Sequence, residues 1–398
     1  MNPDLHKLHP YPFEKLRELK SGISPPKDLA HIALSIGEPK HETPEFVLTE
    51  LTKSLANIGA YPSTLGDKSL RQAVANWLEK RFKLPSDSIH PDFHVLPVTG
   101  TREALFSFTQ CIIDKSSDAL VLMPNPFYQI YEGAALLAGA KPYYLNSIVE
   151  LGNIPDYHGV PDDVWQQCQL LNICTPSNPS GAVLTIEQLQ SLIKLSEKFD
   201  FVIASDECYS EIYFDETQAP PGLLQAAALM GNNHYERCMV FHSLSKRSNL
   251  PGLRSGFVAG DKNIIKNYLK YRTYQGCAMP PHHQTASTFA WQDEQHVIAN
   301  RGLYTQKFQM FIDILKPVIE INQPDAAFYV WLKTPINDQE FAKKLYQQQN
   351  VTVLPGSFLS RTTNSGNPGK NYVRLALVST VEECNDAANR IKSFVKTL

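Results

Sequence analysis

The stretch Phe241-His-Ser-Leu-Ser-Lys-Arg-Ser-Asn-Leu-Pro-Gly-Leu-Arg-Ser-Gly-Phe-Val-Ala-Gly260 carries the most chemical information in the sequence. A β-rich run ends in two hydroxyls that flank Lys246, and Arg254 follows eight residues later. A lone lysine after a strand is ordinarily a solvated residue. Here, however, an amine suited to a Schiff base lies beside Ser243, Ser245 and a forked guanidinium, which are groups that bind phosphate. The set predicts that Lys246 holds an aldehyde cofactor and that its phosphate binds nearby.

Outward from this stretch, short β-rich runs alternate with helical ones. Such alternation favours an α/β fold with a mostly parallel sheet. Ligands of such sheets bind beyond the carboxyl ends of the strands, so the polar residues that follow each run are the candidates. We expect strands at 119–123, 170–174, 201–204, 239–242 and 256–259, and helices at 102–113, 127–138 and 185–199.

The chain has 398 residues, more than the ~250–300 at which one core usually stops growing. We therefore expect a large domain over 46–289, a small C-terminal domain over 290–398, and an N-terminal arm, 1–45, that joins the small domain. The net formal charge of −3 offers no basic field for nucleic acid.

The N-terminus is polar and no apolar run approaches the ~20 residues of a membrane span, so we expect a cytoplasmic enzyme with no membrane partner. The seven cysteines form no CxxC motif, which is typical of reduced thiols and not of a metal site.

Two further motifs supply groups for an aromatic cofactor ring. Asp206 ends the run Phe201-Val-Ile-Ala204 and can pair with a protonated pyridine nitrogen, while Tyr209 can reach a phenolic oxygen of the ring. Asn178, in the turn Asn178-Pro-Ser-Gly181, can donate to the same oxygen. The alternatives are ordinary ones, since aspartate often caps helices and Asn-Pro often forms turns.

Another turn, Gly100-Thr101-Arg102, opens a helix and offers free backbone N–H groups, which bind phosphate. Tyr128 follows and can stack on a ring; an N-cap and a core aromatic are the alternative interpretations. Arg374 lies inside the apolar run Asn371-Tyr-Val-Arg-Leu-Ala-Leu377, where a charge needs a partner. That partner is either a substrate carboxylate or an internal acid.

Together these motifs resemble the class I and II aminotransferases, which are fold-type-I enzymes that depend on pyridoxal 5'-phosphate (PLP). The match runs from Ile36-Gly-Glu-Pro39 to Arg374 with every motif in order. The resemblance implies a large PLP-binding domain with a mostly parallel sheet of the seven-stranded type, flanked by helices, and a smaller α+β domain. It implies that Gly37 lies beside Arg374 at the substrate carboxylate. It also implies a homodimer, in which Tyr61 reaches the phosphate of the neighbouring subunit's cofactor.

A narrower similarity is to the succinyldiaminopimelate aminotransferases of bacterial lysine synthesis, in residues 245–257, 9–14, 125–132 and 205–214. It implies transfer of an amino group from glutamate to N-succinyl-2-amino-6-oxopimelate, giving N-succinyl-LL-2,6-diaminopimelate. Because one site must take acids of two lengths, we expect a roomy distal pocket that involves Arg272 or Tyr274.

Other interpretations stay open at this point. An aminotransferase with aspartate, aromatic or broad specificity would carry the same motifs, and so would a PLP-dependent lyase or synthase, since a fold does not determine a reaction. A PLP-dependent transcription regulator would need an added basic segment that the chain does not have.

Overall fold

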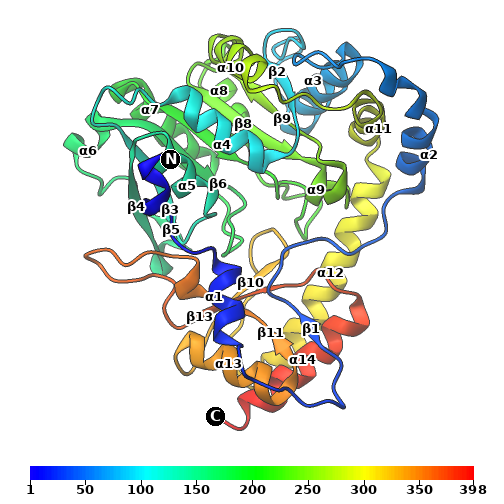
Figure 1. Cartoon of the computed structure of the whole chain (residues 1–398), viewed down its shortest axis with the longest axis vertical. Helices are drawn as coiled ribbons and strands as arrows, with labels where there is room; N and C mark the ends of the chain where they lie inside the picture. Colours follow the sequence, from blue (N-terminus) through cyan, green and yellow to red (C-terminus); the bar gives the residue numbers. More distant parts are fainter.

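A computed structural model describes all residues 1–398, and its larger part is built on one mixed sheet (Figure 1). The eight strands run in the order β2-β9-β8-β7-β6-β3-β4-β5, in which β9 and the edge strand β5 are antiparallel to their neighbours. Their bounds are β2 Val95–Val98, β3 Leu120–Asn125, β4 Lys141–Ile148, β5 Ile154–Pro155, β6 Cys168–Cys174, β7 Val202–Asp206, β8 Cys238–Ser243 and β9 Gly256–Gly260.

Helices cover both faces of this sheet, which explains why its central strands are apolar throughout. In β6, Leu171 and Ile173 pack into one core, whereas Leu170 packs into the core on the other face. One face is covered by α3 (Lys68–Phe82), α7 (Ile186–Phe199), α8 (Leu223–Leu229) and α11 (Pro281–Gln292). The other is covered by α4 (Thr101–Ile112), α5 (Ile130–Leu137) and α10 (Lys262–Gln275).

The smaller part has a separate core that joins Ile32 and Leu34 to residues 308–394. Its antiparallel sheet has the order β10-β13-β12, and β1 pairs with β11 in parallel. The helix α12 runs from the larger part into this core (Figure 1). Bounds are β1 Ile32–Ala33, β10 Tyr329–Lys333, β11 Val351–Thr352, β12 Leu354–Pro355, β13 Tyr372–Ala376, α12 Gln295–Leu315, α13 Asp338–Gln349 and α14 Val381–Val395.

The N-terminal segment touches both parts of the molecule. Its first helix, η1 (Pro3–Lys7), lies beside α5, and α1 (Pro12–Leu19) lies against β12 of the smaller part. The helix α2 (Glu45–Lys53) then packs on α11 of the larger part. The remaining short helices are α6 (Asp162–Gln167) and α9 (Leu244–Arg247), with 3₁₀ turns at Leu55–Gly59, Val149–Leu151, Pro251–Leu253 and Gly356–Phe358.

The predicted fold class is confirmed, and the five expected strands are β3, β6, β7, β8 and β9. The eighth strand of the sheet is the two-residue β5, which has too few residues to show a pattern. The exact domain boundaries near residues 45 and 290 stay a prediction. No helix of the structure combines the length and apolarity that a membrane crossing requires.

Candidate active site

A pocket lies at the carboxyl edge of the large sheet, and residues of the smaller part, among them Tyr329 and Arg374, form its other side. The strands β6, β7 and β8 end here, and β9 begins here because it runs in the opposite direction. Most of the predicted site residues line this pocket and the cavity beside it, namely Gly37, Thr101, Arg102, Tyr128, Asn178, Asp206, Tyr209, Ser243, Ser245, Lys246, Arg254 and Arg374.

Lys246 enters the pocket from the one-turn helix α9, which follows β8 directly. Ser243 caps that helix by accepting a hydrogen bond from the backbone N–H of Ser245 at 3.1 Å. The Nζ of Lys246 donates to the carbonyl oxygen of Gly37. Burial lowers the pKa of Lys246 to about 8. A fraction of the amine is therefore unprotonated near neutral pH, as a nucleophile or general base requires.

Asp206 lies at the end of β7 with only 3% of its surface exposed. Its Oδ1 accepts from the backbone N–H of Cys208 at 3.3 Å, and its Oδ2 accepts from the hydroxyl of Tyr131 at 2.8 Å. Burial raises the pKa of Asp206, and these hydrogen bonds oppose the rise. A buried carboxylate held in this way is matched to a cationic partner inside the pocket.

The cradle for an anion lies between the start of α4 and Arg254. Gly100 has φ 93°, a backbone conformation that favours glycine, and the guanidinium of Arg254 lies where a Cβ would be. Arg254 donates to the carbonyl oxygens of Pro251 at 2.8 Å and Thr99 at 3.4 Å, and no carboxylate pairs with it. With the N-terminus of α4 and the nearby serine hydroxyls, this guanidinium is free to take a phosphate.

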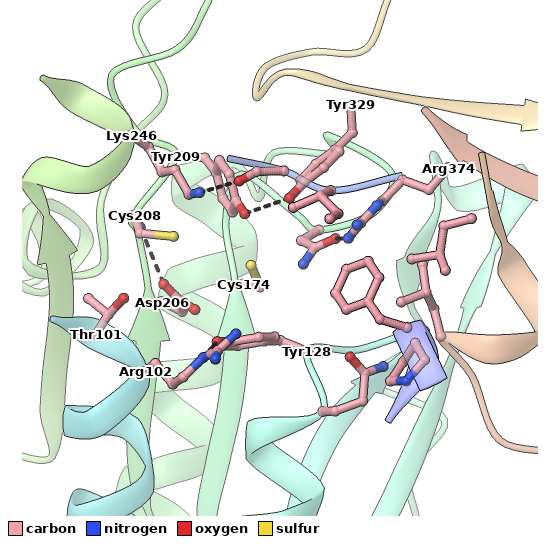
Figure 2. A pocket seen from close by; sticks show the side chains of 18 of the residues that line it. Thr101, Arg102, Tyr128, Cys174, Asp206, Cys208, Tyr209, Lys246, Tyr329 and Arg374 are labelled. Atoms are coloured by element: carbon pink, nitrogen blue, oxygen red, sulfur yellow. Dashed lines mark hydrogen bonds between the residues drawn. The ribbon is translucent and has the colours of Figure 1, made fainter. Parts of the chain in front are cut away.

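Arg374 faces Lys246 from the other side of the pocket, on β13 (Figure 2). It is 4% exposed, donates to Oδ1 of Asn178 at 2.9 Å and to the carbonyl oxygen of Ser35 at 2.7 Å, and lies 4.4 Å from the ring centroid of Tyr329. No acid pairs with this guanidinium, and its buried Nε has no hydrogen-bond partner. A buried cation with an unused donor indicates an anionic ligand.

Aromatic side chains complete the pocket. Tyr209 is 6% exposed, and its hydroxyl lies 3.0 Å from that of Tyr329. The hydroxyl of Tyr128 accepts from Nε of Arg102 at 2.6 Å, and a terminal nitrogen of Arg102 donates to Tyr11 at 3.3 Å. Arg102 therefore ties the N-terminal segment to the start of α4.

Two expected distal residues do not lie in this pocket. Arg272 has a fully buried side chain that pairs with Glu103 at 2.6 Å and donates to the carbonyl oxygen of Cys277 at 3.1 Å. Tyr274 is 87% exposed and belongs to a separate surface hollow on α10. The prediction for Arg272 was wrong, because closeness to the turn at 276–284 says nothing about which side of α10 a residue occupies. Tyr274 does not line the pocket of its own chain, and its part in a distal pocket stays a prediction. Tyr61 is fully exposed and does not line the pocket of its own chain.

Sequence reasoning missed several residues of the site. Tyr131 and Tyr11 stood in stretches quoted only for their family resemblance, and Tyr329 opens β10 directly after three apolar residues. Each is an aromatic residue in an apolar context, which sequence alone cannot tell from a core residue.

Comparison with known proteins places this site in a family. Residues 30–391 match the family model described as aminotransferase class I and II. The chain belongs to this family. An aminotransferase structure from Neisseria meningitidis is 48% identical, with a TM-score of 0.94 over 99% of this chain and 100% of that one.

Two other relatives of this aminotransferase carry more specific names. The LL-diaminopimelate aminotransferase of Nitratidesulfovibrio vulgaris is 29% identical over 393 residues, which cover 97% of each chain. A probable N-succinyldiaminopimelate aminotransferase from Thermus thermophilus is 26% identical, with a TM-score of 0.83 over 96% of this chain and 98% of that one.

Class I and II aminotransferases use pyridoxal 5'-phosphate, and the pocket fits this cofactor. The fit rests on three observations: the close approach of Arg254 to the start of α4, the buried carboxylate of Asp206, and the lysine amine that lines both the pocket with Asp206 and the cavity with Arg254. These groups match a phosphate, a pyridinium nitrogen and an aldehyde respectively.

Proposed function

We propose that this aminotransferase moves an amino group between glutamate and N-succinyl-2-amino-6-oxopimelate, giving N-succinyl-LL-2,6-diaminopimelate. The observation that carries amino transfer is the placement of Lys246, Asp206 and Arg374 around one pocket, with the last of these lacking an acidic partner (Figure 2). The narrower substrate rests on the sequence similarity of residues 245–257 and on the relatives named for diaminopimelate and its N-succinyl derivative.

Each residue has a defined task in this proposal. Lys246 would hold the cofactor covalently, and its free amine would take the proton from the substrate Cα and later return a proton. The cofactor, when bound, would supply a cationic ring that accepts electrons from the substrate. Asp206 would keep the ring nitrogen protonated, and Arg374 would bind the α-carboxylate and so orient the substrate toward the amine of Lys246.

The other residues of the pocket bind and orient the cofactor in this proposal. Arg254, Ser243, Ser245 and the backbone at Gly100 and Thr101 hold the phosphate. Tyr128 covers the ring, and Arg102 holds Tyr128 in place through its hydroxyl. Tyr209 and Asn178 contact the phenolic oxygen; because Oδ1 of Asn178 already accepts from Arg374, its amide NH₂ is the group that donates.

The distal wall of the pocket suits substrates of two lengths. It is formed by the start of α1 and by residues near β12, and these side chains carry no charge that would fix a second carboxylate at one distance. A rigid arginine clamp at the length of glutamate would exclude a longer acid. The side chains of this wall are Tyr11, Pro12, Phe13, Leu354 and Leu359.

A second candidate is transfer to and from LL-diaminopimelate without the succinyl group. The relative from Nitratidesulfovibrio vulgaris, which aligns with nearly the whole chain, favours this candidate. The two candidates differ in one feature of the substrate, a free distal ammonium group or a succinylated one.

Steady-state kinetics separate these possibilities. With glutamate as donor, we expect kcat/KM for N-succinyl-2-amino-6-oxopimelate to exceed that for oxaloacetate and pyruvate by about ten-fold or more. The longer acid can bury methylene groups against the apolar distal wall, and two of them, at ~0.8 kcal/mol each, already account for a ten-fold difference. In the reverse direction, N-succinyl-LL-diaminopimelate and LL-diaminopimelate are compared as donors to 2-oxoglutarate. A preference for the free diamine supports the second candidate. A preference for either small keto acid over the succinylated acceptor contradicts the first candidate, and failure of both diaminopimelate compounds as donors leaves only the family assignment.

The proposed assembly is a homodimer with two shared active sites. Tyr61 is fully exposed in this chain, together with Ile58 and Leu55 on the turn before it. An exposed aromatic residue next to apolar neighbours suits a subunit interface, and two-fold dimers are the commonest oligomers.

A further inference from the structure

We propose that Tyr131 is a positioning residue that keeps Asp206 ionised, through the hydrogen bond that its hydroxyl donates to Oδ2 of that carboxylate. The inference rests on the proposed role of Asp206 as partner of the cofactor's ring nitrogen. The bond is 2.8 Å long, and both residues are buried, with exposures of 1% for Tyr131 and 3% for Asp206. Tyr131 does not line the pocket, so it acts on the cofactor only through Asp206.

Because Asp206 is buried, this hydrogen bond affects whether its carboxyl group is ionised. A carboxylate taken out of water takes up a proton unless donors stabilise its charge. The backbone N–H of Cys208 is one donor, at 3.3 Å, and the hydroxyl of Tyr131 is the closer one. Burial and the nearby negative charge raise the pKa of Tyr131 well above its usual value, so the phenol keeps its proton and donates.

The other titratable groups around Asp206 do not replace this donor. The thiols of Cys174 and Cys208 are weak donors, and His242 on β8 lies 3.2 Å from Glu207, its nearest acid. Lys246 donates to the carbonyl oxygen of Gly37. The groups that face Asp206 are thus Tyr128 before α5, Tyr131 on α5, Cys174 on β6, Cys208 after β7, His242 on β8 and Lys246 on α9.

Two tyrosines that are close together in the chain have different tasks. Tyr128, just before α5, lines the pocket, whereas Tyr131, three residues later on α5, donates its hydroxyl hydrogen to Asp206. Their ring centroids are 5.8 Å apart and the rings are nearly perpendicular. The stretch 125–132 therefore supplies both the aromatic ring proposed to cover the cofactor and the hydroxyl that donates to the carboxylate of Asp206.

The test compares two ligands of the apoprotein: pyridoxal 5'-phosphate and an analogue whose ring nitrogen is replaced by a C–H group. In Tyr131→Phe, we expect the affinity for the cofactor at neutral pH to fall roughly ten-fold, as for loss of a hydrogen bond to a charged group. The affinity for the analogue should not change, because it has no ring nitrogen to pair with Asp206. The deficit should narrow as pH rises, since a higher pH ionises Asp206 without help from Tyr131.

Tyr268→Phe is the matched control, because Tyr268 is a buried tyrosine of the same core whose hydroxyl bonds to Ser107 and Ala104 instead. An equal loss for both ligands in Tyr131→Phe, or the same selective loss in Tyr268→Phe, overturns the inference. Asp206→Asn distinguishes a failure of the role proposed for Asp206 from a failure of the role proposed for Tyr131. If Asp206→Asn lowers the affinity for both ligands equally, or for neither, the role of Asp206 itself is wrong. If Asp206→Asn lowers only the affinity for the cofactor and Tyr131→Phe does not, only the role of Tyr131 fails.

Discussion

Lys246→Ala is expected to abolish turnover and to leave the cofactor without a covalent attachment. Lys246 is the one amine that lines the pocket, next to the buried Asp206 and across from Arg374. Removing it deletes both the attachment point and the base that moves the Cα proton. A positioned general base alone contributes about 10²–10⁴-fold, so the combined loss should bring the rate below detection.

Burial alone does not explain the reactivity predicted for this lysine, and the chain contains a control. Burial also lowers the pKa of Lys307 to about 8, but Lys307 lies outside the pocket and bonds to His41. Borohydride reduction of the cofactor-loaded enzyme, followed by peptide mass mapping, should label Lys246 and not Lys307. A label on Lys307 or on any other lysine would show that the attachment site is elsewhere.

Asp206→Asn is expected to retain the cofactor at saturating concentration while slowing removal of the Cα proton by orders of magnitude. Asparagine has nearly the same shape and preserves the packing at the end of β7. It cannot carry the negative charge that favours a protonated ring nitrogen, so the ring loses its capacity to accept electrons.

Single-turnover absorbance measurements with glutamate give the rate of this step directly. The attachment of the cofactor to Lys246 can be verified in the same samples by reduction. A single-turnover rate close to that of the unmodified protein would mean that Asp206 has been given the wrong role.

The fold and the centre of the site could be predicted from the sequence because their signals are local. The strand ends that carry Asp206 and Lys246 are short apolar runs followed at once by polar residues, and the edge of a parallel sheet brings such ends together. Arg374 stood out because a cation in an apolar strand demands an anion. Because Arg374 has no acidic partner in the structure, a substrate carboxylate is favoured over an internal acid as its partner.

The distal pocket could not be predicted, because it is assembled from segments far apart in the chain. The start of α1, near Tyr11, meets residues such as Leu354 that lie more than three hundred positions later. No local sequence pattern predicts that two such distant segments line the same pocket. Arg272 was chosen for its sequence position, and its burial against Glu103 depended on the orientation of α10, which periodicity did not settle.

A half-reaction with glutamate alone shows directly whether this protein transfers amino groups through a lysine-bound cofactor. The cofactor-loaded protein is mixed with excess glutamate and no keto acid, and both the absorbance of the cofactor and the release of 2-oxoglutarate are followed. We expect a change in the spectrum together with one equivalent of 2-oxoglutarate per cofactor, and a return of the original spectrum when an acceptor keto acid is added. An unchanged spectrum, or continuous product release without any acceptor, would rule out amino transfer by this route.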